Sequence, residues 1–204
     1  MPRSRSIRVW TLLAVNTLSL GAAGTKGSPA DRPTGERTKV SRPSTTNLSP
    51  EAASLDFLTK PKLFPIPLPQ LAERLKPFAP FKEDGTADPP SDFRVFVGET
   101  PEIAHIEVTY QIDAKRDWSF STASFFLLPK GRSLRTLREE VVRAFSARLG
   151  KPAWAEKKPP VGFGWRLHGH WELMVSEKES AIESIPKSGP HLEVTVCEPQ
   201  GEPE

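Results

Sequence analysis

Two histidines stand one residue apart between two tryptophans in the stretch WRLHGHWELMV, which runs from Trp165 to Val175. Apolar and polar residues alternate through this stretch, as they do along a β-strand that has one buried face. On such a strand His168 and His170 share the polar face, roughly 6.5–7 Å apart, which is close enough to ligate one metal ion. The stretch therefore predicts a single strand that offers two ligands for zinc or copper.

A third ligand, Cys197, comes from the last predicted strand, HLEVTVC. If the two strands pair as a hairpin, a register that places Cys197 opposite His168 or His170 forms a Cys-His-His metal site, with Glu172 or His105 as the fourth ligand. The same cluster would also support thiol chemistry, with Cys197 activated by a neighbouring histidine. The alternative is a solvated sheet face without a site, and the sequence favours it, because a long connecting loop fixes the register weakly.

The sequence lacks the other common motifs of catalysis and cofactor binding. It has no glycine-rich phosphate loop and no G-x-S-x-G nucleophile elbow. Four tryptophans could form a strip for a sugar or a peptide: Trp118, Trp154, Trp165 and Trp171. Trp165 and Trp171 fall on the predicted buried face, however, which favours a packing role. We assign no catalytic residue and, beyond the metal hypothesis, no cofactor.

Five strands are predicted to position these side chains. Their ranges are Phe93–Val97, Ala104–Asp113, Trp118–Leu128, Phe163–Ser176 and His191–Glu198. The alternation is strict in AHIEVTYQID but slips near Ala123 in the third strand, which predicts a β-bulge there. In the fourth strand, Gly169 is expected to make room on the core face for a neighbouring aromatic side chain.

One helix is predicted between the third and fourth strands, in SLRTLREEVVRAFSARLG. Ser133 or Thr136 can cap its start, and Gly150 ends it. Its apolar stripe consists of Leu134, Leu137, Val141, Ala144, Phe145 and Leu149. Three strands, a helix and two strands predict the α+β class: an antiparallel sheet of about five strands with one helix on its apolar face.

Composition divides the chain into five segments. Residues 1–24 combine a basic start, an apolar stretch and small residues, the pattern of a secretory signal peptide. Residues 25–54 are rich in Ser, Thr and Pro and are predicted to be a disordered tether. A proline-rich apolar strap follows over residues 55–92, then the α+β domain over residues 93–198 and a flexible tail over residues 199–204.

The strap allows two interpretations. It contains FLTKPKLFPIPLPQLAERLKPFAPF, in which Leu71, Leu75 and Phe78 have helical spacing and Pro77 ends the helix. We favour packing of this segment onto the core of its own domain, because a disordered linker needs few large apolar residues. The alternative is a strip over residues 57–81 that binds an unknown protein or envelope partner, as other proline-rich ligands do.

The charge balance and the cysteine count limit which functions are possible. Three of the 28 basic residues lie within the first 24 residues, which have no acid, so the remaining chain carries 25 basic and 25 acidic residues. This balance argues against nucleic acid as a partner. Cys197 is the only cysteine, so no internal disulfide can form.

The sequence thus predicts an exported protein, periplasmic or extracellular, with no transmembrane helix once the signal is cleaved. The leading hypothesis for its function is a non-catalytic interaction or binding module. The alternative is a metal-binding or thiol-reactive protein built on His168, His170 and Cys197. A domain that stabilises or inhibits a neighbouring enzyme remains open as a variant of the leading hypothesis.

Overall fold

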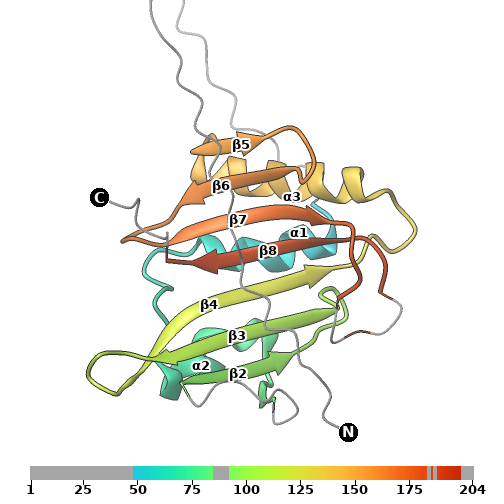
Figure 1. Cartoon of the computed structure of the whole chain (residues 1–204). Coiled ribbons are helices and arrows are strands. Elements are labelled where there is room, and N and C mark those ends of the chain that lie inside the picture. Colours follow the sequence, from blue (N-terminus) through green and yellow to red (C-terminus); the bar gives the residue numbers. More distant parts are fainter. Residues whose placement is uncertain (1–47, 85–91, 183–184, 186–187, 199–204) are drawn as a thin grey trace, which may run out of the picture. The chain divides into compact units, whose positions relative to one another are not determined.

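The computed structural model describes residues 48–84, 92–182, 185 and 188–198, and these contain an eight-stranded antiparallel sheet (Figure 1). The strands follow the order β1-β2-β3-β4-β8-β7-β6-β5 across the sheet. Their bounds are β1 Lys82–Glu83, β2 Phe93–Gly98, β3 His105–Ile112, β4 Trp118–Leu127, β5 Trp154–Glu156, β6 Gly162–Arg166, β7 Glu172–Lys178 and β8 His191–Cys197. The α+β class and the antiparallel sheet are confirmed.

The number of strands was predicted wrongly, as five instead of eight. Two of the additional strands, β1 and β5, lie at the sheet edges and have two and three residues, too few for alternation to show in the sequence. The third arises because the predicted strand Phe163–Ser176 is in fact two strands, β6 and β7. The predicted bulge is present, because the register of β3 and β4 shifts between Thr109 and Tyr110, near Ala123.

The long helix α3 (Leu134–Leu149) matches its prediction. Ser133 is the N-cap, and its hydroxyl accepts a hydrogen bond from the Thr136 amide at 3.0 Å. Gly150 ends the helix with a φ of 82°, a conformation that costs little only without a Cβ. The predicted stripe is buried or half-buried, and the helix packs against β7 and β8.

Shorter helical segments precede the sheet, and Figure 1 shows α1 and α2 on the same side of it as α3. They are α1 Pro50–Leu55, η1 Asp56–Thr59, η2 Leu68–Gln70, α2 Leu71–Arg74 and η3 Lys76–Phe78. The helix predicted from the spacing of Leu71, Leu75 and Phe78 is therefore present as a single α-turn followed by a 3-10 turn. Pro77 accounts for the break, since its ring prevents a regular α-helix from continuing.

The predicted tether overlaps α1, so its boundary at residue 54 is wrong. Pro50 stands in the first turn of α1, and the Ser49 hydroxyl accepts from the Ala52 amide at 3.4 Å. Glu51 is buried and forms an ion pair with Arg132 at 2.7 Å. A cap, a long-range ion pair and the burial of Ala52 and Leu55 hold this part of the chain in the fold.

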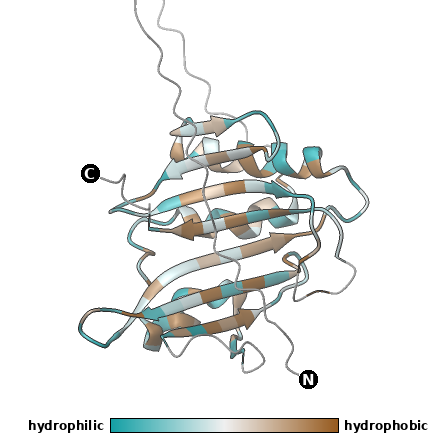
Figure 2. Ribbon diagram, viewed as in Figure 1, coloured by the Kyte–Doolittle hydropathy of each residue, from teal (hydrophilic) through white to brown (hydrophobic). Residues whose placement is uncertain are grey.

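The sheet has two unlike faces. Residues opposite each other in an antiparallel ladder point to the same face, so the alternation along each strand gathers apolar side chains on one face and polar ones on the other. Figure 2 shows apolar and polar residues alternating along the strands. One face, the covered face, packs under the helices. Its fully buried side chains are Ile106, Val108, Tyr110, Ala123, Phe125, Leu127, Leu173, Val175, Leu192, Val194 and Val196. The other face, the open face, carries mostly polar side chains.

The strap supplies a large share of the core on the covered face. Its buried side chains are Leu55, Leu58, Leu63, Phe64, Ile66, Leu71, Leu75 and Phe78. Phe78 contacts Phe125 of β4, with ring centroids 5.0 Å apart. The interpretation that the strap packs onto its own domain is therefore confirmed, and these side chains are not displayed to a partner.

Three predicted segments lie outside the described residues: the signal peptide over residues 1–24, most of the tether and the tail over residues 199–204. Among the helices of the described ranges, none is long and apolar enough to cross a membrane.

Candidate functional site

The two histidines lie in a turn and not on a strand. Arg166 at the end of β6 pairs with Glu172 at the start of β7, and the Leu167 amide donates to the Trp171 carbonyl at 2.8 Å. This leaves His168, Gly169 and His170 as the tip of the β6–β7 turn. The prediction of one continuous strand is wrong because alternation continues through a tight hairpin, whose two arms bury the same face.

Gly169 has a φ of 83°, so it serves the turn and not the core. Its predicted role of making room for an aromatic side chain on the core face is wrong. Trp165 and Trp171 are buried as predicted, at 1% and 9% exposure.

Cys197 does not meet the histidines through the predicted register. In the β7–β8 ladder it stands opposite Glu172, and in the β4–β8 ladder opposite Thr122. Burial, and secondarily the negative charge of Glu172, raises the pKa of the Cys197 thiol to about 11. Throughout the described residues, no group of three His, Cys, Asp or Glu side chains is placed to hold a metal ion.

The centre of the open face is internally paired. The Ser124 and Thr195 hydroxyls each lie 3.1 Å from one carboxylate oxygen of Glu193. Lys178 lies 3.2 Å from the other oxygen. Beside this network, Phe126 stands between His105 and His191, with ring centroids 5.6 Å apart on each side. Because these groups are partnered by one another, this part of the face offers few open contacts to a ligand.

The edge of the open face is different because Trp154 lies across it. In the β5–β6 ladder Trp154 pairs with Gly164, and its ring also reaches Gly162. A Cβ at Gly164 would lie 2.2 Å from the indole nitrogen, and a Cβ at Gly162 would lie 3.2 Å from the far side of the ring. The indole therefore lies over bare backbone, which only two glycines on the same strand face permit.

The orientation of this ring is fixed at its edge. The indole N–H of Trp154 donates a hydrogen bond to Oε1 of Glu172. Trp154 nevertheless remains 40% exposed, and it is one of three exposed large apolar residues in the described chain. A flat aromatic ring that is held in place and open to solvent is a stacking platform.

The platform borders a hollow of about 470 Å³, which we call the Trp154 hollow. Its other walls include Arg166, His170, Trp171 and Glu172. Arg166 and His170 are exposed, and within the described chain the side chain of neither has a hydrogen-bond or ion-pair partner. The hollow thus combines one aromatic surface with two uncommitted polar side chains and one carboxylate, in a volume typical of small-ligand sites.

Sequence reasoning considered Trp154 only as one member of a tryptophan strip. Gly162 and Gly164 are the signal that could have distinguished Trp154 from the other tryptophans. These two glycines share a strand face and leave a gap that an aromatic ring on the next strand can fill. That signal depends on recognising β5, which is too short to be predicted from alternation.

Comparisons with known proteins find no match to a family model, to a curated protein or to a solved structure.

Proposed function

We propose that the chain is a non-catalytic binding module that holds a saccharide against Trp154. The observation that carries this proposal is the fixed, 40% exposed indole at the wall of a hollow of about 470 Å³. The face of an aromatic ring carries partial negative charge, and the C–H groups on one side of a pyranose ring carry partial positive charge. A sugar ring therefore packs on an open indole more favourably than on an aliphatic surface.

The polar side chains of the hollow suit the hydroxyl groups of such a ligand. Arg166 presents guanidinium donors, and His170 presents an imidazole that can donate or accept. Glu172 uses Oε1 for the Trp154 indole, so its Oε2 is available to accept from a hydroxyl. A mostly apolar seat with a few polar groups that set orientation is the usual composition of a small-ligand site.

A non-catalytic role is supported by the state of the nearest reactive groups. The pKa of Cys197, raised to about 11, leaves little thiolate at neutral pH, and thiolate is the nucleophilic form. Both carboxylate oxygens of Glu193 are already engaged within the domain, by Ser124, Thr195 and Lys178.

We also propose that this binding takes place outside the cytoplasm, in the periplasm or the extracellular medium. The support is the sequence pattern of residues 1–24, in which basic, apolar and small residues follow one another. Saccharide polymers of cell walls and surfaces are ligands that an exported module would encounter.

The test is calorimetric titration of the full chain with tetrasaccharides of glucose, xylose and N-acetylglucosamine. We expect at least one of them to bind, and Trp154→Ala to weaken its affinity by about tenfold or more, the loss expected for one aromatic contact. Gly164→Ala should act in the same direction, because its Cβ displaces the indole. The matched control is Phe93→Ala, which removes another exposed aromatic residue, 36% exposed on β2.

Folding of each variant is checked by circular dichroism, and Trp154→Phe retains an aromatic ring if Trp154→Ala proves unstable. Binding of none of the three sugars would overturn the saccharide as ligand. Equal loss in Phe93→Ala and Trp154→Ala would overturn the location of the site.

A further inference from the structure

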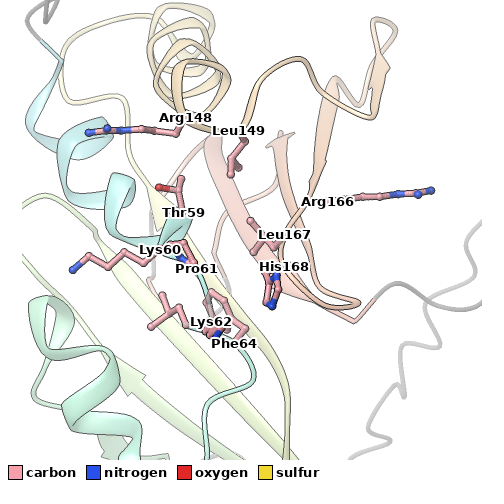
Figure 3. Close-up of a pocket in the computed structure, with 11 residues that line it drawn as sticks. Thr59, Lys60, Pro61, Lys62, Phe64, Arg148, Leu149, Arg166, Leu167 and His168 are labelled. Atoms are coloured by element: carbon pink, nitrogen blue, oxygen red, sulfur yellow. The ribbon is translucent and has the colours of Figure 1, made fainter.

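We infer a second binding site on the other side of the β6–β7 turn, where a hollow of about 300 Å³ fits a small carboxylate that carries an apolar chain. Three segments that are distant in sequence enclose it: the strap around residues 59–64, the end of α3 and the start of the β6–β7 turn (Figure 3). It is separate from the Trp154 hollow, although Arg166 contributes to the walls of both.

Part of the wall of this hollow is apolar. Leu63 and Phe64 come from the strap and are 6% and 7% exposed, so they form part of the core beneath it. Leu149 from the end of α3 and Leu167 from the turn are half-buried. Figure 3 shows both leucines directed into the space between the strap and the hairpin. An apolar group bound there would be removed from water on several sides.

The rim of the hollow is cationic. The residues that line it include Lys60, Lys62, Arg148 and Arg166, together with His168, and no acid is among them. This composition differs from the described chain in general, where acids and bases are mixed. An excess of positive over negative side chains among the lining residues favours an anionic ligand over a neutral one.

Two of these cations are already engaged. Arg148 forms a bidentate ion pair with Asp56, at 2.9 and 3.1 Å. Lys60 places its ammonium 4.0 Å from the centre of the Phe57 ring. Figure 3 shows the Arg148 and Arg166 side chains extending outward to opposite sides. The site must therefore depend on the remaining basic side chains.

Those side chains are Lys62 and His168. Neither side chain has a hydrogen-bond or ion-pair partner in the chain as described. Lys62 has a φ of 61°, an unfavourable conformation for a residue with a Cβ, and its carbonyl accepts from Arg74 at 2.9 Å. Backbone strain that the surrounding structure holds in place occurs preferentially at functional positions. It fixes Lys62 at the rim, where a carboxylate would meet both its ammonium and the imidazole of His168.

The experiment is titration of the full chain with three probes. Octanoate has both the chain and the charge, 1-octanol has the chain alone, and inorganic phosphate has the charge alone. We expect octanoate to bind more tightly than either of the others. Lys62→Gln and His168→Gln should each weaken octanoate binding by about tenfold, as when one charge-assisted hydrogen bond is lost. The matched control is Lys157→Gln, an exposed lysine away from the hollow.

Equal binding of octanoate and 1-octanol would overturn the role of the cations. Tightest binding by phosphate would overturn the role of the apolar walls, and no binding of octanoate would overturn the site. Trp154→Ala should leave octanoate affinity unchanged, since Trp154 does not line this hollow. The saccharide and the carboxylate proposals can therefore fail independently of each other.

Discussion

The two faces of the sheet use the same strands for different purposes. On the covered face the strand side chains are fully buried against helices and the strap. On the open face most of them are polar, and several are joined to each other, as Glu193 is to Ser124, Thr195 and Lys178. Both faces are thus satisfied within the domain, one by packing and the other by hydrogen bonds and ion pairs.

Three polar side chains that have no partner within the described residues lie close together around the β6–β7 turn. Arg166, His168 and His170 lie there, and two hollows flank them. The two proposals place recognition at the turn and the adjoining edge, whereas stability resides mainly in the covered face. Substitutions on the two faces should therefore differ in which property they change.

The largest expected difference is between two phenylalanines on opposite sides of the sheet. Phe78 of the strap is fully buried against Phe57 and Phe125. We expect Phe78→Ala to lower the free energy of unfolding by about 3–5 kcal/mol, from lost burial and the cavity it leaves. Phe126→Ala on the open face should cost only about 1 kcal/mol, because its ring is half-buried.

Equilibrium unfolding in urea measures both values under the same conditions. A small effect for Phe78→Ala would mean that the strap contributes little to the core. In that case its apolar side chains would again be available to a partner, as the alternative interpretation of residues 57–81 requires.

A smaller effect is expected from the ion pair that attaches α1 to the domain. Burial alone would raise the pKa of Glu51, but its backbone hydrogen bond and the Arg132 guanidinium together hold that pKa below its ordinary value. The ionised carboxylate thus stabilises the fold above the ordinary glutamate pKa of about 4.3, and this contribution is lost as the pH falls through the lowered folded-state value. We expect Glu51→Gln to cost about 1–3 kcal/mol at neutral pH.

The measurement is the free energy of unfolding of the wild type and of Glu51→Gln from neutral to acidic pH. The difference between them should shrink as the pH falls. Glu139→Gln is the control, since Glu139 pairs with Arg135 on the exposed side of α3 and surface pairs contribute little. A gap that persists in acid would show that Glu51 acts through packing rather than charge.

The elements with long, regular alternation could be predicted from the sequence. β3, β8 and α3 have the ranges and faces that periodicity indicates, because each buries one face over at least seven residues. Short elements could not be predicted this way. β5 has three residues, and α1 is held by Glu51 and Arg132, which are 81 positions apart in the sequence.

The candidate site was harder to predict than the fold, because it depends on register. The stretch WRLHGHWELMV does border both hollows, but its histidines are turn residues and not strand residues. Trp154 acquires its position only from pairing with Gly164. Alternation in a sequence does not reveal a hairpin when both of its arms bury the same face. The turn position of the histidines and the placement of Trp154 could therefore be obtained only from the observed strand pairing.

The smallest expected effect is on the reactivity of the Cys197 thiol. It distinguishes the observed β7–β8 register from the metal cluster that the sequence suggested. With a pKa of about 11, the thiol of the folded protein should react slowly with a disulfide reagent, and its rate should rise with pH toward that value. Near pH 8 the thiolate fraction is only on the order of 0.1%. Glu172→Gln removes the negative charge opposite the thiol but keeps an oxygen for the Trp154 indole, so it should increase the rate severalfold.

Zinc should not protect Cys197 in either protein, because the β7–β8 register pairs the thiol with Glu172 and leaves both histidines in the turn. Protection by zinc that disappears in His168→Ala would contradict this register and restore the predicted cluster.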